Sequence, residues 1–241
     1  MNITFLDLGR INGKVLISIE HKKIKNVHLK VYNDLSVKVS VPEKVDNDWV
    51  TIFLDKRKDW INKQIYKFKQ SSGINCGGTI KNGYSIQLLG KDYRIFIKRG
   101  PNNIVIDEKN IIVTIKNEND LDYATNYFDN WWNGFAKKVY SQKIDEFYDL
   151  FFRKYNINKP QFQVRKMKTM WGNCNQQKSL ITLNKYLLKA DLLSIEYVIL
   201  HELTHLLYPR HNMDFYSFLT IHMPNWKERK NYLDTDVVQG I

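Results

Sequence analysis

VILHELTHLLYPRH, residues 198–211, is the stretch that decides the fold of the second half of the chain. Its apolar residues predict a buried helix that begins near Asp191, which can cap it, and ends before Pro209. Within this helix His201 and His205 are four residues apart, so their side chains lie on one face. Two imidazoles placed in this way can bind the same metal ion.

A third histidine follows beyond the predicted end of the helix. His211 comes six residues after His205, and a chain reversal at Pro209 can return it to the same ion. A catalytic zinc site needs three protein ligands and an open position, so we expect His201, His205 and His211 to bind zinc. The spacing matches the metzincin motif, in which a glycine stands at the position of Tyr208. The turn must therefore differ here, or Tyr208 must adopt an unusual backbone conformation.

A glutamate directly follows the first of the three histidines. Glu202 lies beside the predicted metal-binding face, where its carboxylate can take a proton from water without binding the ion. Zinc lowers the pKa of the water that it activates toward about 7, which makes that water a nucleophile near neutral pH. The motif therefore predicts a zinc-dependent hydrolase with Glu202 as its general base.

The first half of the chain is rich in predicted strands. Alternating apolar and polar residues predict strands at 15–20, 27–32, 36–41, 84–90, 93–98, 103–107 and 111–116. Asn33 and Asp34 predict a hairpin turn after the second of these strands. Residues 47–70 predict one amphipathic helix with a basic outer face, which phosphates or solvent could contact. No internal repeat is apparent in the sequence.

The second half combines helices with short strands. A long amphipathic helix is predicted over 121–155, and strands are predicted over 162–167 and 179–184. Beyond the histidine helix, Asn212 can cap a further helix and Asn225 can cap the last one.

A polar segment, 117–120, predicts a boundary between two regions. Residues 1–118 form the predicted β-rich N-terminal region with its one basic helix, and residues 119–241 form the region that carries the HExxH active-site helix. Since no low-complexity linker separates the two regions, we expect them to pack together. The fold class is thus predicted to be α+β.

Composition bears on location and partners. The chain has 241 residues, of which 43% are hydrophobic, enough for one large domain or two small ones. Two cysteines, Cys76 and Cys174, form no C-x-x-C pair, so neither a disulfide framework nor a thiolate zinc site is expected. The N-terminal residues lack a signal-peptide pattern, and no apolar run approaches the about 20 residues that cross a bilayer. We expect a cytoplasmic protein without a membrane association.

The net charge of +12 has two interpretations. A basic surface can simply be solvated, or it can bind a polyanionic partner such as nucleic acid or a nucleotide.

A series of motifs resembles the YgjP-like metallopeptidase domain family, whose relatives are the SprT and WLM metallopeptidases. In order along the chain the motifs are Lys166-Met167-Lys168, Trp171-Gly172-Asn173-Cys174, Leu183-Asn184, Tyr197-Val198, His201-Glu202-Leu203 with His205 and His211, Phe215-Tyr216 and Pro224. The β-rich start and Arg57-Lys58-Asp59-Trp60-Ile61 are also similar, so the resemblance covers nearly the whole chain. It implies a zincin-like fold for 119–241, zinc on the three histidines and a catalytic role for Glu202.

The resemblance also implies where substrate would lie. In zincins a strand beside the active-site helix offers its edge to an extended substrate, and strand 179–184 is the candidate. Asn184 in that strand is predicted to bond substrate, to brace the site or to cap the next turn. Trp171 is predicted to line the pocket or to pack in the core, and Lys168 and Arg165 are candidate substrate-binding cations.

Two further residues are predicted to be structural. Cys174 has no histidine partner visible in the sequence, so we expect a small buried residue and not a nucleophile. His222 follows the motif at some distance, and we expect it to pack in the structure and not to bind the ion.

The sequence is compatible with more than one kind of hydrolysed bond. The motif and the family resemblance favour a peptide bond. The same family carries a UTP pyrophosphatase assignment, and Arg165, Lys166, Lys168 and Arg210 could bind a triphosphate. A third alternative is a DNA-associated protease or a basic nucleic-acid-binding module, although structural zinc sites are usually rich in thiolates.

Overall fold

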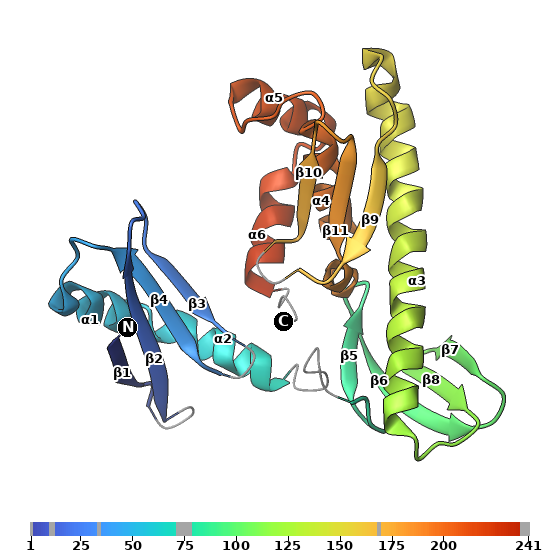
Figure 1. The fold of residues 1–241 in the computed structure, drawn as a ribbon, viewed down its shortest axis with the longest axis horizontal. Helices are drawn as coiled ribbons and strands as arrows, with labels where there is room; N and C mark the ends of the chain where they lie inside the picture. Colours follow the sequence, from blue (N-terminus) through green and yellow to red (C-terminus); the bar gives the residue numbers. More distant parts are fainter. Residues whose placement is uncertain (1, 10–12, 33–34, 71–78, 168–169, 237–241) are drawn as a thin grey trace. The chain divides into compact units, whose positions relative to one another are not determined.

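The computed structural model describes residues 2–9, 13–32, 35–70, 79–167 and 170–236. Contacts within the chain divide it into two compact units, Met1–Asn75 and Cys76–Ile241. The order of strands and helices along the chain can be followed in Figure 1. The predicted α+β class is confirmed, with a β-rich first half and most of the helix in the second.

A four-stranded sheet forms most of the first unit. Its strands are β1 (Asn2–Asp7), β2 (Lys14–Lys22), β3 (His28–Val31) and β4 (Val37–Pro42), in the order β1-β2-β4-β3. β2 and β4 are parallel, and the other two pairs are antiparallel. The predictions match β2, β3 and β4, while the turn at Asn33 and Asp34 lies outside the described residues. β1 was not predicted, because two apolar residues, the exposed Phe5 and the buried Leu6, follow one another and interrupt the alternation of apolar and polar residues.

Two helices follow where the sequence predicts one. α1 (Asn47–Lys56) is capped by Asp46, whose carboxylate accepts a hydrogen bond from the backbone N–H of Trp49 at 2.7 Å. α2 (Lys58–Gln70) begins after a break at Arg57, where the backbone N–H of Arg57 bonds to the carbonyl of Leu54 three residues back. Both helices contribute to an apolar core within this unit, together with the inner face of the sheet: Leu6, Leu8, Ile17, Ile19, Val37, Val39, Val41, Val50, Leu54, Ile61 and Ile65.

The second unit begins with another four-stranded sheet. Its strands are β5 (Ser85–Leu88), β6 (Lys91–Arg99), β7 (Asn103–Asp107) and β8 (Asn110–Ile115), in the order β5-β6-β8-β7. β6 and β8 are parallel, and the other pairs are antiparallel. All four strands match predicted ones. Their order and directions are those of the first sheet.

The longest helix, α3 (Leu121–Phe147), connects this sheet to the rest of the unit (Figure 1). Asp120 caps it by accepting a hydrogen bond from Tyr123 N, and a π-helical turn and a 3-10 turn extend it to Tyr155. α3 packs against β8 and also against the last sheet and α4. The predicted boundary after residue 118 therefore falls inside the second unit, because α3 joins the elements on either side of it.

A three-stranded sheet stands beside the histidine helix. It consists of β9 (Gln161–Arg165), β10 (Gly172–Asn175) and β11 (Leu180–Asn184), in the order β10-β11-β9. β11 pairs with β10 antiparallel and with β9 parallel, so both of its edges are occupied. The prediction that strand 179–184 offers a free edge is wrong, and β10 stands at the edge instead. β10 was not predicted because its sequence, Gly-Asn-Cys-Asn, lacks apolar alternation.

Three helices complete the second unit. They are α4 (Leu192–Thr204), α5 (Met213–His222) and α6 (Trp226–Asp236), and a 3-10 segment, Lys185–Lys189, precedes α4. The predicted caps are confirmed for two of them: Asp191 accepts a hydrogen bond from Ser194 N, and Asn212 accepts one from Phe215 N. α4 contacts α3, α5, α6, β10 and β11, so it is the central element of the unit. None of the helices within the described ranges has both the length and the apolar character needed to cross a membrane.

Candidate metal centre

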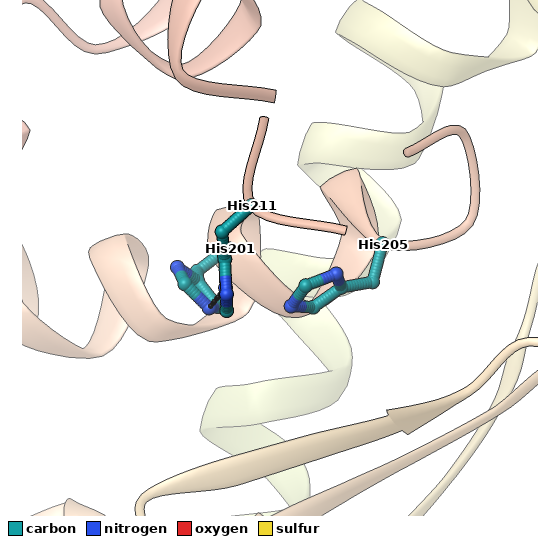
Figure 2. Close-up of side chains that lie close together, drawn as sticks. All are labelled: His201, His205 and His211. Carbon is teal, nitrogen blue, oxygen red and sulfur yellow. Dashed lines mark hydrogen bonds between the residues drawn. The ribbon is translucent and has the colours of Figure 1, made fainter. Parts of the chain in front are cut away.

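Three histidine rings converge at the C-terminal end of α4 (Figure 2). His201 lies on α4, His205 is the residue that ends it, and His211 comes from the turn that leads to α5. One ring nitrogen of each lies within 4.8 Å of the others, and the Nε2 atoms of His201 and His211 are 3.0 Å apart. Zinc–nitrogen bonds of about 2.0–2.1 Å allow two ligands to be at most about 4.2 Å apart. The three histidines could therefore hold a single ion once their rings rotate to point one nitrogen each at it.

A backbone carbonyl fixes the orientation of His205. Its Nδ1 lies 3.1 Å from the carbonyl oxygen of Tyr208. Because a carbonyl only accepts, Nδ1 carries the proton and donates it, and Nε2 keeps the lone pair that a metal needs. Tyr208 itself is not among the described residues with a positive φ, and its N–H bonds to the carbonyl of Thr204 at 2.9 Å. The turn therefore differs from the metzincin turn, and Tyr208 needs no unusual backbone conformation.

Burial keeps two of the three histidines, His201 and His205, neutral. Burial, and after it the nearby His205, His211 and Lys230, lower the pKa of His201 to about 3. Burial also lowers the pKa of His205, against the opposing effect of its hydrogen bond to Tyr208. A neutral imidazole is the form that binds a metal ion, so the protonation state suits the role.

A fully buried phenylalanine supports all three rings. The ring centroid of Phe215 lies 4.9 Å from that of His201 and 4.7 Å from those of His205 and His211. Asn212 caps α5 through the N–H of Phe215 and so places this ring. In the sequence Phe215 stands out only as part of the Phe215-Tyr216 motif, and its contact with the three histidine rings could not be predicted.

Glu202 is buried on α4 and faces β10. Its carboxylate lies against Gly172, at the first position of that strand. Burial raises the pKa of Glu202 to about 8. Burial, and then the nearby Glu202, raises the pKa of the Cys174 thiol to about 12. Cys174 is therefore protonated near neutral pH, as expected for a residue that is not a nucleophile.

Asn184 is fully buried, and its side chain is engaged by the backbone around it. Its amide nitrogen donates to the carbonyls of Met167 and Met170, both at 2.9 Å. Its oxygen accepts from Tyr186 N at 3.1 Å, which caps the 3-10 segment after β11. The side chain therefore braces the segment that leads to β10 as well as capping the next turn.

The remaining residues that the sequence predicts to contact substrate are Arg165, Trp171 and Lys168. Arg165 is exposed at the end of β9, and its Nε donates to Gln163 Oε1 at 3.1 Å. Trp171 is half-buried, and its carbonyl accepts from Asn184 N at 2.8 Å. Lys168 lies outside the described residues. Substrate contact by Arg165 or Trp171 stays a prediction.

His222 packs between two aromatic rings and stands apart from the histidine cluster. Its ring centroid lies 4.4 Å from those of Phe151 and Phe218. The structural role that the sequence predicts for His222 agrees with these contacts.

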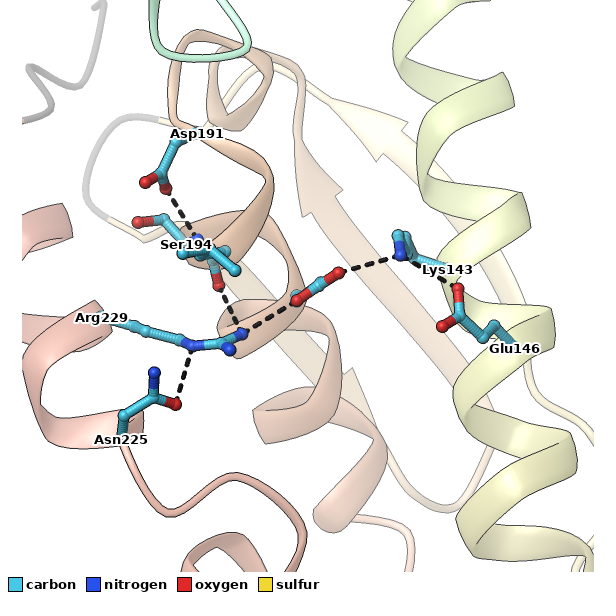
Figure 3. Close-up of polar contacts among 8 residues, drawn as sticks. Lys143, Glu146, Asp191, Ser194, Asn225 and Arg229 are labelled. Carbon is cyan, nitrogen blue, oxygen red and sulfur yellow. Dashed lines mark hydrogen bonds and ion pairs between the residues drawn. The ribbon is translucent and has the colours of Figure 1, made fainter.

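An ion-pair network fastens the helices around α4 (Figure 3). Glu196 of α4 pairs with Lys143 of α3 and with Arg229 of α6, each at 2.9 Å. Arg229 also donates to the carbonyl of Leu193 and to Asn225 Oδ1, at 3.2 and 3.0 Å. Since these side chains are mostly shielded from solvent, the network holds α6 in register with the helix that bears the histidines.

Solved structures of metallopeptidases are similar to part of this chain. The metallopeptidase zymogen abylysin of Pyrococcus abyssi is 19% identical, with a TM-score of 0.37 over 41% of this chain and 94% of that one. The metallopeptidase zymogen jannalysin of Methanocaldococcus jannaschii is 18% identical, with a TM-score of 0.34 over 43% of this chain and 97% of that one. No curated protein matches the sequence.

A family model describes most of the chain. The model of the YgjP-like metallopeptidase domain matches residues 25–236, a range that includes the three histidines, Glu202 and β9–β11. The chain therefore belongs to the YgjP-like metallopeptidase domain family.

Proposed function

We propose that this protein is a zinc-dependent metallopeptidase in which His201, His205 and His211 hold the ion and Glu202 is the general base. The observation that carries the proposal is the convergence of three histidines, with a buried glutamate next to the first of them on the same helix. Three nitrogen ligands leave a position open, as in catalytic zinc sites. Membership of a metallopeptidase family supports the same reading.

The chemistry divides between the ion and the chain. A zinc ion held here would polarise the carbonyl of a peptide bond and lower the pKa of a nearby water molecule. Burial raises the pKa of Glu202 to about 8, and the charge of a zinc ion held beside it would favour the ionised carboxylate, which can accept a proton from that water. The same carboxyl group can then donate the proton to the leaving amine.

β10 is suited to hold an extended substrate. In the part of the chain that the structure describes, β10 pairs with β11 on one side and has no strand on the other. An exposed strand edge offers backbone N–H and C=O groups to a peptide, which can add as a further strand. Since β10 also contacts α4, this edge takes the role that the sequence assigns to strand 179–184.

The test compares the wild-type protein with Glu202→Gln at equal zinc content. Both are assayed on an unfolded protein substrate and on a panel of nucleotides that includes UTP. We expect proteolysis by the wild type and a loss of about 10²–10⁴-fold in the variant, the range that general bases contribute. Full activity in the glutamine variant, or a wild type that binds no zinc, contradicts the proposal. Release of pyrophosphate from UTP without proteolysis would show that the protein is a nucleotide pyrophosphatase and not a peptidase.

A further inference from the structure

An open pocket adjoins the histidine cluster on the side of α5 and α6. Its volume is about 1030 Å³, and His201 and His211 form part of its lining. A pocket of this size holds at least one large side chain or a small ligand. Because two of the three histidines line it, anything bound there lies next to the proposed reaction site.

One side of the pocket is a continuous aromatic wall. Trp226 stacks between Tyr197 and Tyr216, with ring centroids 6.3 and 5.4 Å away and interplanar angles of 12° and 18°. Tyr216 in turn stacks on His211, at 6.0 Å and 23°. This aromatic wall (Tyr197, Trp226, Tyr216) leads from α6 directly to the metal centre. Tyr197 and Trp226 are buried and Tyr216 is 40% exposed, so the aromatic wall gives the pocket an apolar side of ring edges, which favours apolar and aromatic partners.

The α5 side of the pocket exposes apolar side chains to solvent. Met213 is 81% exposed and Ile221 is 73% exposed, and both line the pocket. Neither side chain stabilises the fold by burial in this state. An apolar surface that is grouped in a pocket beside a reaction site is typical of a ligand-binding surface.

The charge at the rim of the pocket is positive. Lys227 and Lys230 of α6 line it and are exposed, and the ammonium group of Lys227 lies 5.6 Å from the ring centroid of Trp226. No aspartate or glutamate is among the described residues that line the pocket. The rim therefore complements a carboxylate, and it disfavours a cationic group.

The Glu196–Arg229 pair holds this side of the pocket in place. Arg229 lies on α6 between Lys227 and Lys230, and through Glu196 it ties α6 to α4 and α3 (Figure 3). The aromatic wall and the rim lysines are thus fixed relative to His201, which lies on the same helix as Glu196. A fixed distance between a side-chain pocket and the reacting bond is what substrate selection requires.

We propose that this pocket is a side-chain subsite that selects peptides with a large apolar or aromatic residue next to the cleaved bond, followed or preceded by a carboxylate that Lys227 pairs with. The inference rests on the proposed peptidase function and names the substrates of that site. The carboxylate can belong to an acidic side chain or to the end of the peptide.

Binding to the zinc-loaded Glu202→Gln protein tests the subsite separately from hydrolysis. The probes are labelled peptides that carry one phenylalanine or one alanine in a serine and glycine background, with glutamate, lysine or glutamine beside it. We expect the phenylalanine peptides to bind at least about tenfold more tightly than the alanine peptides, because the phenylalanine side chain buries more apolar area. Peptides with glutamate should bind up to about fivefold more tightly than peptides with lysine, which is the contribution of an exposed ion pair. The glutamine peptide, with a free or an amidated C-terminus, shows whether a terminal carboxylate serves equally.

Two variants at exposed positions test the lining, each with a matched control. Ile221→Asn should weaken the phenylalanine peptide and leave the alanine peptide unchanged, while Leu150→Asn, also at an exposed position but outside the pocket lining, should change neither. Lys227→Glu should reverse the preference for glutamate over lysine. Lys138→Glu on α3 makes the same change in net charge and should not reverse it.

The outcomes separate the two proposals. Equal binding of the phenylalanine and alanine peptides, or an Ile221 variant that behaves as its Leu150 control does, overturns the subsite. An unchanged glutamate preference in Lys227→Glu overturns the carboxylate part. Selective binding that the wild type never converts into cleavage supports the subsite and refutes the peptidase function alone.

Discussion

A β carbon at position 172 would lie 2.7 Å from Oε1 of Glu202 and 2.7 Å from its Cγ. Distances below about 3 Å between such atoms essentially do not occur, so the carboxylate and a side chain at position 172 exclude one another. Gly172 has an ordinary backbone conformation here, and what the position requires is space. The glycine in the Trp-Gly-Asn-Cys motif thus allows β10 to approach the helix that carries the proposed base.

Gly172→Ala should therefore displace the carboxylate of Glu202. We expect kcat to fall by about 100-fold, the effect of a shift near 1 Å in a catalytic group, with zinc content unchanged. Gly134→Ala on α3 is the matched control, because a β carbon there meets nothing within 4 Å. The control should keep its activity and gain up to about 1 kcal/mol in stability, as an alanine in a helix interior does. Full activity in the Gly172 variant would show that Glu202 tolerates displacement.

His211→Ala should remove a ligand, whereas His222→Ala should not. Changes to groups that only orient a ligand cost about 10–100-fold in metal affinity, so loss of a ligand should cost at least about 100-fold. Equilibrium dialysis followed by metal analysis measures this directly. His222 packs on Phe151 and Phe218, so its variant should lose stability and keep its zinc. Equal zinc affinity in the two variants would place the ion elsewhere.

Asn184→Ala should destabilise the second unit. It removes the hydrogen bonds to Met167 O, Met170 O and Tyr186 N, and it leaves these backbone groups unsatisfied near the start of β10. We expect the free energy of unfolding to fall by about 3 kcal/mol. Urea unfolding followed by tryptophan fluorescence gives the value. The exposed Asn173→Ala should change it by less than about 0.5 kcal/mol, and a similar loss in both variants would contradict the bracing role.

The first unit should show a pH dependence that Glu20 controls. Ion pairs with Lys22 and Lys38 lower the pKa of Glu20 from 4.5 to about 2. A lowered pKa in the folded state stabilises the protein above pH 4.5, and this contribution is lost as the pH falls toward 2. Glu20→Gln should consequently lower the melting temperature more at pH 5 than at pH 2.5. Glu43→Gln, an exposed change in the same unit, serves as the control, and a loss independent of pH would refute the assignment.

Features with a local cause could be predicted from the sequence. The caps at Asp191 and Asn212 and the strands of the second sheet depend on residues close in sequence, and they appear where expected. The grouping of His201, His205 and His211 follows from helix spacing and one turn. The cytoplasmic location and the binding of nucleic acid rest on composition alone and stay predictions.

Features that depend on distant partners could not be predicted. β11 is an inner strand only because β10, whose sequence has no apolar pattern, pairs with it. The need for space at Gly172 arises from Glu202 on another element, and the aromatic wall forms because Arg229 and Glu196 bring α6 onto α4. In each case the deciding contact joins elements that the sequence separates.

The shared strand order of the two four-stranded sheets has a consequence for the ancestry of this protein. Each sheet places its second and fourth strands side by side in parallel, and a helix follows each sheet along the chain. Duplication of one ββββα segment, with later divergence of both copies, produces this signature after sequence similarity has been lost. Relatives that carry one copy without the other are expected on this history, and a survey that always finds the two together would argue against it.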